Sequence, residues 1–96
     1  MISRRGLSTL LAGKSGELVR EVLQWYRVAR ASDWRSLDDV RRLFPSADQV
    51  GAVLIFDIRH NRYRLIVSAA YPRQRLYVKA LLTHKEYERK EWMKWA

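Results

Sequence analysis

The chain has 96 residues, enough for one small domain, and its apolar share of 48% supplies a modest core. Lys and Arg number 19 against 10 Asp and Glu, so the net charge of +9 favours nucleic acid, an acidic protein or an anionic membrane surface as partner. The absence of cysteine excludes disulfides and thiolate metal sites and fits a reducing compartment. No apolar run approaches the roughly 20 residues of a membrane span. We therefore expect a cytoplasmic protein with no membrane segment.

The first half of the chain carries helical periodicity. A short edge strand is expected at residues 1–3 and a weak helix at 5–12, and the strongest amphipathic pattern predicts a helix over 15–30. Ser36-Leu37-Asp38-Asp39 predicts a capping box that opens a further helix, which Pro45 ends. The residues expected to be buried on that helix are Leu37, Val40, Leu43 and Phe44.

After Gly51 the periodicity changes to that of strands. A continuous apolar run is typical of a strand buried on both faces, and it is followed by a tight turn in which His60 and Asn61 tolerate positive φ. Polar residues from Thr83 onward predict a short C-terminal helix. The strands are expected at residues 53–58, 63–71 and 75–82. The predicted fold class is α+β, with N-terminal helices packed on a small antiparallel meander.

The stretch from Arg59 to Lys85 holds seven Lys or Arg and two His, with no Asp or Glu. Such a strand-forming surface repels itself unless an anion binds, and a phosphate backbone is the natural anion. The stretch leads into Thr83-His84-Lys85-Glu86-Tyr87, which brings an imidazole, an ammonium and a phenol into one short segment. A basic sheet next to groups that transfer protons predicts RNA cleavage rather than RNA binding alone.

The register of the last two strands groups the candidate residues. If Arg73 and Gln74 form a two-residue turn, Arg64 faces Thr83 and Lys79 lies on the same face of the sheet. A slip of one residue would separate Lys79 from Arg64. On this register the opposite face is apolar and consists of Leu65, Val67, Ala69, Val78, Ala80 and Leu82.

RNA can be cut without a metal when a base removes the 2′-hydroxyl proton, an acid protonates the leaving oxygen and a cation stabilises the phosphorane-like transition state. The guanidinium of Arg64 matches phosphate geometry, and His84 has a suitable pKa for acid or base work. Tyr87 could donate a proton or stack a base. Lys79 or Lys85 could act as base only with a lowered pKa, so the base stays open among these two and His84.

Plain structural interpretations stand beside these roles. Arg64 could be a solvated strand charge, His84 a helix cap, Tyr87 a core residue, Lys79 ordinary positive surface and His60 only a turn residue. Two distant histidines without cysteine form a poor ligand set, so no metal and no cofactor are expected.

Several segments together resemble the HigB family of toxins, which belongs to the RelE superfamily of type II toxin–antitoxin systems. The resemblance covers roughly residues 18–92, and Asn-x-Tyr-Arg-Leu with Thr-His-x-Glu-Tyr is its most specific part. The segments that carry it are Asp33-Trp34, Asp38-Asp39-Val40, Phe44-Pro45-Ser46-Ala47-Asp48, Phe56-Asp57-Ile58, Asn61-Arg62-Tyr63-Arg64-Leu65-Ile66-Val67, Tyr77-Val78 and Leu82-Thr83-His84-Lys85-Glu86-Tyr87.

The resemblance implies a RelE-like fold and an endoribonuclease that cuts mRNA on the translating ribosome and is neutralised by a HigA-like helix-turn-helix antitoxin. Carried over residue by residue, the family's strand arginine matches Arg64 and its C-terminal cluster matches His84, Lys85 and Tyr87. The remaining cations are then expected to dock the mRNA and the ribosomal RNA, at Arg59, His60, Arg62, Arg73, Arg75 and Lys85.

Two other functions remain open from the sequence. The same basic face could belong to a non-catalytic RNA- or DNA-binding module, whose binding would depend steeply on salt. It could also belong to an inactive toxin relative that acts only through an acidic protein partner.

Overall fold

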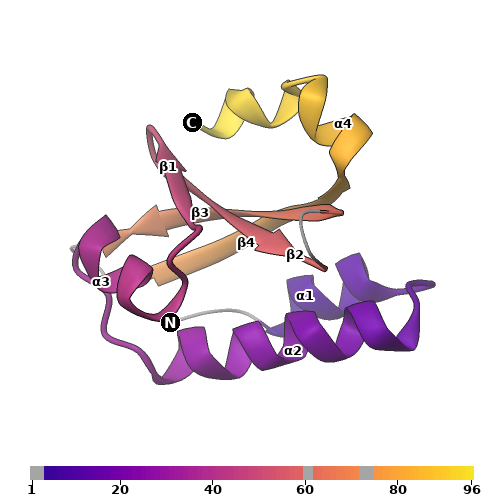
Figure 1. Ribbon diagram of the computed structural model, residues 1–96, viewed down its shortest axis with the longest axis horizontal. Coiled ribbons are helices and arrows are strands. Elements are labelled where there is room, and N and C mark those ends of the chain that lie inside the picture. Colours follow the sequence, from indigo (N-terminus) through magenta and orange to yellow (C-terminus); the bar gives the residue numbers. More distant parts are fainter. Residues whose placement is uncertain (1–3, 60–61, 72–74) are drawn as a thin grey trace.

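The computed structural model describes residues 4–59, 62–71 and 75–96. The strand expected at residues 1–3, the turn residues 72–74, and His60 and Asn61 lie outside these residues. The described chain forms an α+β fold in which helices flank a four-stranded antiparallel sheet (Figure 1). The predicted fold class is therefore confirmed.

The N-terminal helices are α1 (Arg4–Leu11) and α2 (Gly16–Ala31). Helix α2 begins where the Ser15 hydroxyl oxygen accepts a hydrogen bond from the Leu18 amide at 3.3 Å, which satisfies one of the unpaired first-turn donors. Its apolar positions recur at helical spacing and bury one stripe against the sheet. The buried residues of this stripe are Leu18, Val22, Trp25, Tyr26 and Ala29. The helix predicted over residues 15–30 is thus confirmed.

Helix α3 (Leu37–Leu43) forms without the expected capping box. Ser36 makes no side-chain cap hydrogen bond, and the carboxylate of Asp39 accepts from the Arg35 amide at 3.0 Å. Val40 is fully buried as expected, but Leu43 is 53% exposed because the helix buries only one narrow face. The predictions of a capping box and of a buried Leu43 were wrong.

The strands are β1 (Asp48–Val50), β2 (Val53–Ile58), β3 (Tyr63–Ala70) and β4 (Arg75–Thr83), and they pair in that order. Strand β1 was not predicted, because it has only three residues and begins with two polar ones. It joins β2 through a tight turn that pairs Val50 with Val53, with Gly51 at φ 57°. The continuous burial expected for β2 is confirmed at all positions but Asp57.

The predicted register of the β3–β4 hairpin is wrong. Arg64 pairs with Leu82 rather than Thr83, and the residue opposite Ser68 on β4 is Tyr77. The last pair is Ala70 with Arg75, so the connection is longer than the two-residue turn assumed. A bulge between Ile66 and Val67 shifts the register again and leaves Lys79 as an extra residue on β4.

The two faces of the sheet are covered by different ends of the chain (Figure 1). Helices α1 and α2 cover one face, over a core that includes Leu54, Phe56 and Leu65. The C-terminal α4 (His84–Glu88) and the 3-10 helix η2 (Glu91–Trp95) cover the other face. That second core contains Val53, Ile55, Ile66, Ala80 and Trp92, with Leu82 packed against it. Ala80 and Leu82 therefore lie on the Arg64 face, opposite to the prediction, because of the register.

None of the helices in the described part of the chain is long and apolar enough to cross a membrane.

Candidate active site

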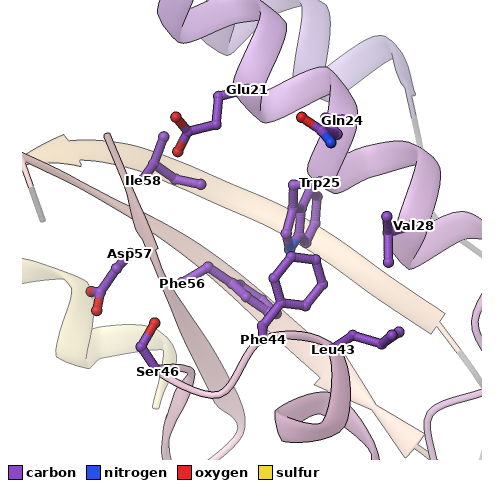
Figure 2. Close-up of a pocket in the computed structure, with 10 residues that line it drawn as sticks. All are labelled: Glu21, Gln24, Trp25, Val28, Leu43, Phe44, Ser46, Phe56, Asp57 and Ile58. Carbon is purple, nitrogen blue, oxygen red and sulfur yellow. The ribbon is translucent and has the colours of Figure 1, made fainter. Parts of the chain in front are cut away.

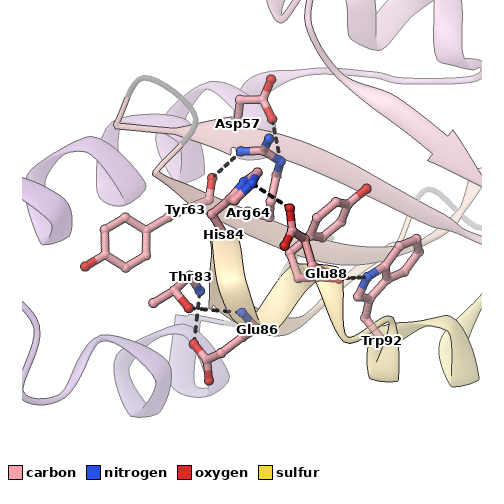
Figure 3. A network of polar contacts seen from close by, with 9 residues as sticks. Asp57, Tyr63, Arg64, Thr83, His84, Glu86, Glu88 and Trp92 are labelled. Carbon is pink, nitrogen blue, oxygen red and sulfur yellow. Dashed lines mark hydrogen bonds and ion pairs between the residues drawn. The ribbon is translucent and has the colours of Figure 1, made fainter.

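Arg64 lies at the start of β3 with only 14% of its side chain exposed. Its Nε is 3.0 Å from Oδ1 of Asp57, the residue directly opposite on β2 (Figure 3). Its Nη1 also donates to the Tyr63 carbonyl at 3.4 Å. The guanidinium is therefore held in one orientation, which is unlike a solvated strand charge.

Tyr87 connects Arg64 to the C-terminal helices. The guanidinium carbon of Arg64 lies 5.3 Å from the centre of the Tyr87 ring, within cation–π range. The second aromatic contact of Tyr87 is with Trp92, whose ring is nearly parallel to the Tyr87 ring, with the two ring centres 5.1 Å apart. Trp92 Nε1 also donates to the Tyr87 carbonyl at 3.0 Å. The three side chains form a stack that anchors α4 over the Arg64 face.

The electrostatics of Tyr87 favour its protonated form. Burial raises the pKa of the Tyr87 phenol above its ordinary value of 10.0, and the charges of Asp48 and Asp57 act in the same direction. The neighbouring Arg64 cation partly opposes this rise in pKa. The phenol is therefore protonated at neutral pH, as an ordinary tyrosine is, and the raised pKa makes it a weaker acid.

His84 is the first residue of α4, and Thr83 before it is the cap. The Thr83 hydroxyl accepts from the Glu86 amide at 3.2 Å, and the Glu86 carboxylate accepts from the Thr83 amide at 3.0 Å. These hydrogen bonds with Thr83 lower the pKa of the Glu86 carboxyl. One interpretation of the sequence made His84 the cap of this helix. In the structure the cap is Thr83, the residue before it.

The imidazole of His84 is more than half exposed, and its Nε2 lies 2.8 Å from Oε1 of Glu88 one turn later (Figure 3). The His84 amide donates to the Arg62 carbonyl at 3.1 Å, so His84 and Arg64 sit at the same end of the β3–β4 hairpin. Because Glu88 can only accept, this contact requires a proton on Nε2, which makes Nδ1 the acceptor in the neutral imidazole.

Lys79 does not join this cluster. It lies on β4 three residues before Leu82, the partner of Arg64, which is about 10 Å along a strand that rises roughly 3.3 Å per residue. Its Nζ instead lies 5.8 Å from the centre of the exposed Tyr77 ring. The structure thus brings Arg64, His84 and Tyr87 to one end of the sheet and leaves Lys79 apart.

The cations predicted to dock RNA differ in their surroundings. Arg59 has φ 55°, donates its amide to Glu21 at 2.7 Å and pairs its guanidinium with Glu17 at 2.7 Å, so α2 holds it. Its left-handed backbone occupies the turn in which His60 and Asn61 were expected to supply positive φ. The docking cations with exposed side chains are Arg62, Arg75 and Lys85. His60 and Arg73 lie outside the described residues.

Sequence reasoning missed Asp57, Glu88 and Trp92, which orient the candidate residues. The signal for Asp57 was present, because a tight turn over residues 59–62 pairs Ile58 with Tyr63 and hence Asp57 with Arg64. The stretch from Arg59 to Lys85 lacks acids along the chain, but the neighbouring strand and helix supply them. In the part of the chain that the structure describes, no three His, Cys, Asp or Glu side chains gather as a metal site.

A pocket of about 350 Å³ lies between α2, α3 and β2, and Figure 2 shows aromatic side chains inside it and two carboxylates at one end. The carboxylates belong to Glu21 and Asp57. The lining contains no Lys or Arg that could pair with a phosphate, so this pocket is a poor site for RNA. Its lining consists of Glu21, Gln24, Trp25, Val28, Leu43, Phe44, Ser46, Phe56, Asp57 and Ile58.

No curated protein matches the sequence. A family model does match, over residues 19–90, and it describes the RelE-like toxic component of a toxin–antitoxin system. The match includes most of α2, the whole sheet and α4, and with them Arg64, His84 and Tyr87. A family of this kind implies an antitoxin as partner, and the α+β architecture agrees with a RelE-like fold. The chain therefore belongs to the HigB toxin family, the RelE-like toxic component of a toxin–antitoxin system.

Proposed function

We propose that this toxin is an endoribonuclease that cuts mRNA on the translating ribosome, by attack of a 2′-hydroxyl on the scissile phosphate without a metal. The observation that carries the proposal is the gathering of a fixed guanidinium, a protonated phenol and an imidazole at one end of the sheet, at Arg64, Tyr87 and His84. The mRNA substrate, the ribosome and a cytoplasmic location rest on the family resemblance.

Arg64 would stabilise the charge that develops on the phosphate oxygens. Asp57 and the Tyr87 ring hold its guanidinium before substrate arrives, so little reorganisation is needed in the transition state. The same pair with Asp57 reduces the net charge offered to the phosphate. Arg64 therefore acts through the placement of its donors more than through long-range attraction.

His84 would carry out a proton transfer. Its Nε2 contacts Glu88, so Nδ1 is the atom that would accept the 2′-hydroxyl proton, or return a proton to the leaving oxygen. The phenol of Tyr87 would be a second donor, because it carries a proton at neutral pH as an ordinary tyrosine does, and its raised pKa makes it a weaker acid. Lys85, exposed beside His84, remains the alternative base.

The antitoxin would be a HigA-like helix-turn-helix protein that neutralises the toxin. The net charge of +9 favours an acidic surface on whichever part of the partner meets the toxin.

A second function is a module that binds RNA without cutting it. The observation that favours it is that two of the candidate catalytic side chains already face carboxylates, Arg64 with Asp57 and His84 with Glu88. Such a module would bind RNA with a steep salt dependence and leave it intact.

The test expresses the parent, Arg64→Ala and His84→Ala, with Arg20→Ala as a matched control on the exposed face of α2. Growth arrest and primer extension on translated mRNA are measured. We expect Arg64→Ala to lower cleavage about 10²- to 10³-fold, the usual cost of removing one transition-state donor. If the parent and the three variants arrest growth and cleave mRNA equally, the assigned site is rejected. Salt-dependent RNA binding by the parent with no discrete cuts would favour the binding module.

A further inference from the structure

The bulge in the β3–β4 ladder changes which side chains of β4 share a face with Arg64. Before the bulge, Ala80 pairs with Ile66, on the Arg64 face. After it, Tyr77 pairs with Ser68, which is again on the Arg64 face because it lies four residues from Arg64 on β3. A regular ladder would have put Val78 there instead. The extra residue, Lys79, thus aims Tyr77 and then Arg75 toward the face that carries the candidate active site.

Tyr77 is an aromatic side chain that the fold leaves exposed on β4. It is 43% exposed, and among the large hydrophobic residues that the structure describes as exposed it is the aromatic one. The Lys79 ammonium lies 5.8 Å from the ring centre. An exposed ring with a cation beside it is the combination that binds single-stranded nucleic acid, because the ring stacks on a base while the cation meets the phosphate.

The surroundings of this pair suit a polyanion. Strand β4 contains no Asp or Glu, and it forms an edge of the sheet, so an extended chain can run along it. Arg75, two residues before Tyr77, is an exposed cation on the same strand. The carboxylates of Asp57 and Glu88 lie near Arg64 and His84, at the other end of β4.

We propose that Tyr77 and Lys79 form a second RNA site, in which the Tyr77 ring stacks on one base of the single-stranded substrate and Lys79 pairs with a neighbouring phosphate. This inference rests on the proposed function, since it treats the strand cut at Arg64 as the ligand. It gives Lys79 a binding role in place of the catalytic one considered from the sequence.

The sheet geometry sets where along the RNA this base lies. Ser68, the partner of Tyr77, is four residues from Arg64, or about 13 Å along β3 at roughly 3.3 Å per residue. That distance is several times the roughly 3.4 Å rise between stacked nucleotides of one strand. The stacked base therefore belongs to a nucleotide two or more positions from the scissile phosphate.

The test measures binding of short 2′-O-methyl RNAs, which cannot be cut because the attacking hydroxyl is blocked. Each RNA carries the fluorescent base 2-aminopurine at a different position, and stacking on Tyr77 is expected to quench one position most strongly. We expect Tyr77→Ala to weaken binding about tenfold and remove that quenching, while Tyr77→Phe and Tyr77→Trp retain both. We expect Lys79→Ala, but not Lys79→Arg, to reduce the slope of log affinity against log salt by about one.

Because the RNA cannot be cut, this result is independent of whether the toxin is a nuclease. Parent-like affinity and quenching in Tyr77→Ala would overturn the second site, even if Arg64→Ala had lost cleavage as proposed. Equal quenching at every RNA position would also overturn it, since it would show binding without a register. If the parent shows position-specific quenching with the 2′-O-methyl RNAs but makes no cuts in translated mRNA, the second site is supported and the nuclease is rejected. Circular dichroism of each variant checks that the exposed substitutions leave the fold intact.

Discussion

Asp57 and Arg64 stand directly opposite each other in the β2–β3 ladder, and Asp57 Oδ1 lies 3.0 Å from Arg64 Nε. Both side chains are less than a quarter exposed, at 23% and 14%. The stretch from Arg59 to Lys85 therefore lacks acids only along the chain. In space, the Asp57 carboxylate on the neighbouring strand fixes the orientation of the Arg64 guanidinium.

The first prediction concerns the strength of this pair. Partly buried ion pairs are weakly screened, and removing one partner leaves the other charge without compensation. We expect Asp57→Asn to lower the free energy of unfolding by about 1–3 kcal/mol. Urea unfolding of Asp57→Asn, Arg64→Gln and the double variant measures the coupling, which we expect at about 0.5–3 kcal/mol.

The exposed Asp33–Arg35 pair is the control, with a coupling of about 1 kcal/mol or less. Equal couplings for the two pairs would contradict this interpretation.

The second prediction separates the ring of Tyr87 from its hydroxyl. Tyr87→Phe keeps the ring between Arg64 and Trp92, so its stability should remain close to that of the parent. Tyr87→Ala removes that ring and should cost about 2 kcal/mol, the lower end for a large-to-small change because the ring is only half-buried. If the phenol donates a proton, Tyr87→Phe should lower cleavage of translated mRNA about 10²-fold or more. If Tyr87→Phe cleaves mRNA as well as the parent, the phenol does not donate a proton and Tyr87 acts only through its ring.

The third prediction concerns two glycines with opposite surroundings. Gly51 has φ 57°, and a Cβ there would lie 2.7 Å from the backbone carbon of Ala96. Gly51→Ala should therefore lower the free energy of unfolding by about 1–3 kcal/mol through backbone strain. Gly16 has nothing within 4 Å of the added carbon and lies in α2, so Gly16→Ala should stabilise by about 0.4–1 kcal/mol. Urea unfolding compares the two variants, and a neutral Gly51→Ala would contradict the strain expected from the positive φ and from the contact with Ala96.

The fourth prediction is a pH dependence from the capping box of α4. The pKa of Glu86 is lowered from its ordinary value of 4.5 by its hydrogen bonds with Thr83. A lowered folded-state pKa stabilises the fold fully above the unfolded-state pKa, and the contribution is lost as the pH falls through the folded-state value. The parent should therefore exceed Glu86→Gln in stability at neutral pH, and the difference should shrink below about pH 4.5. Unfolding by urea at several pH values measures it, and a constant difference would exclude the carboxylate as its source.

The sequence was informative where one local pattern decided the structure. The amphipathic spacing of α2 and the unbroken apolar run of β2 each admit one arrangement, and both elements formed as predicted. It failed where two local signals compete. Asp39 could cap α3 or bond Arg35, and it does the latter. Strand β1 has only three residues, so its pairing with β2, not its own composition, makes it a strand.

The candidate site was predictable by residue type but not by arrangement. The family resemblance and the chemistry of the side chains selected Arg64, His84 and Tyr87, and the fold gathers these three. The grouping with Lys79 depended on a register, and a slip of one residue moves every side chain to the other face. The bulge between Ile66 and Val67 shifts this register, and it was not predicted from the sequence.

The sequence by itself determined the family, the α+β class and the positive charge, because these follow from residue identity and local spacing. Only the tertiary structure decided which charges meet. Asp57 is seven residues from Arg64 along the chain yet bonded to it across the ladder, and Tyr77 turns toward the same face only after one extra residue on β4. Electrostatic and stacking contacts depend on distance in space, and distance in space is set by strand pairing rather than by the order of residues.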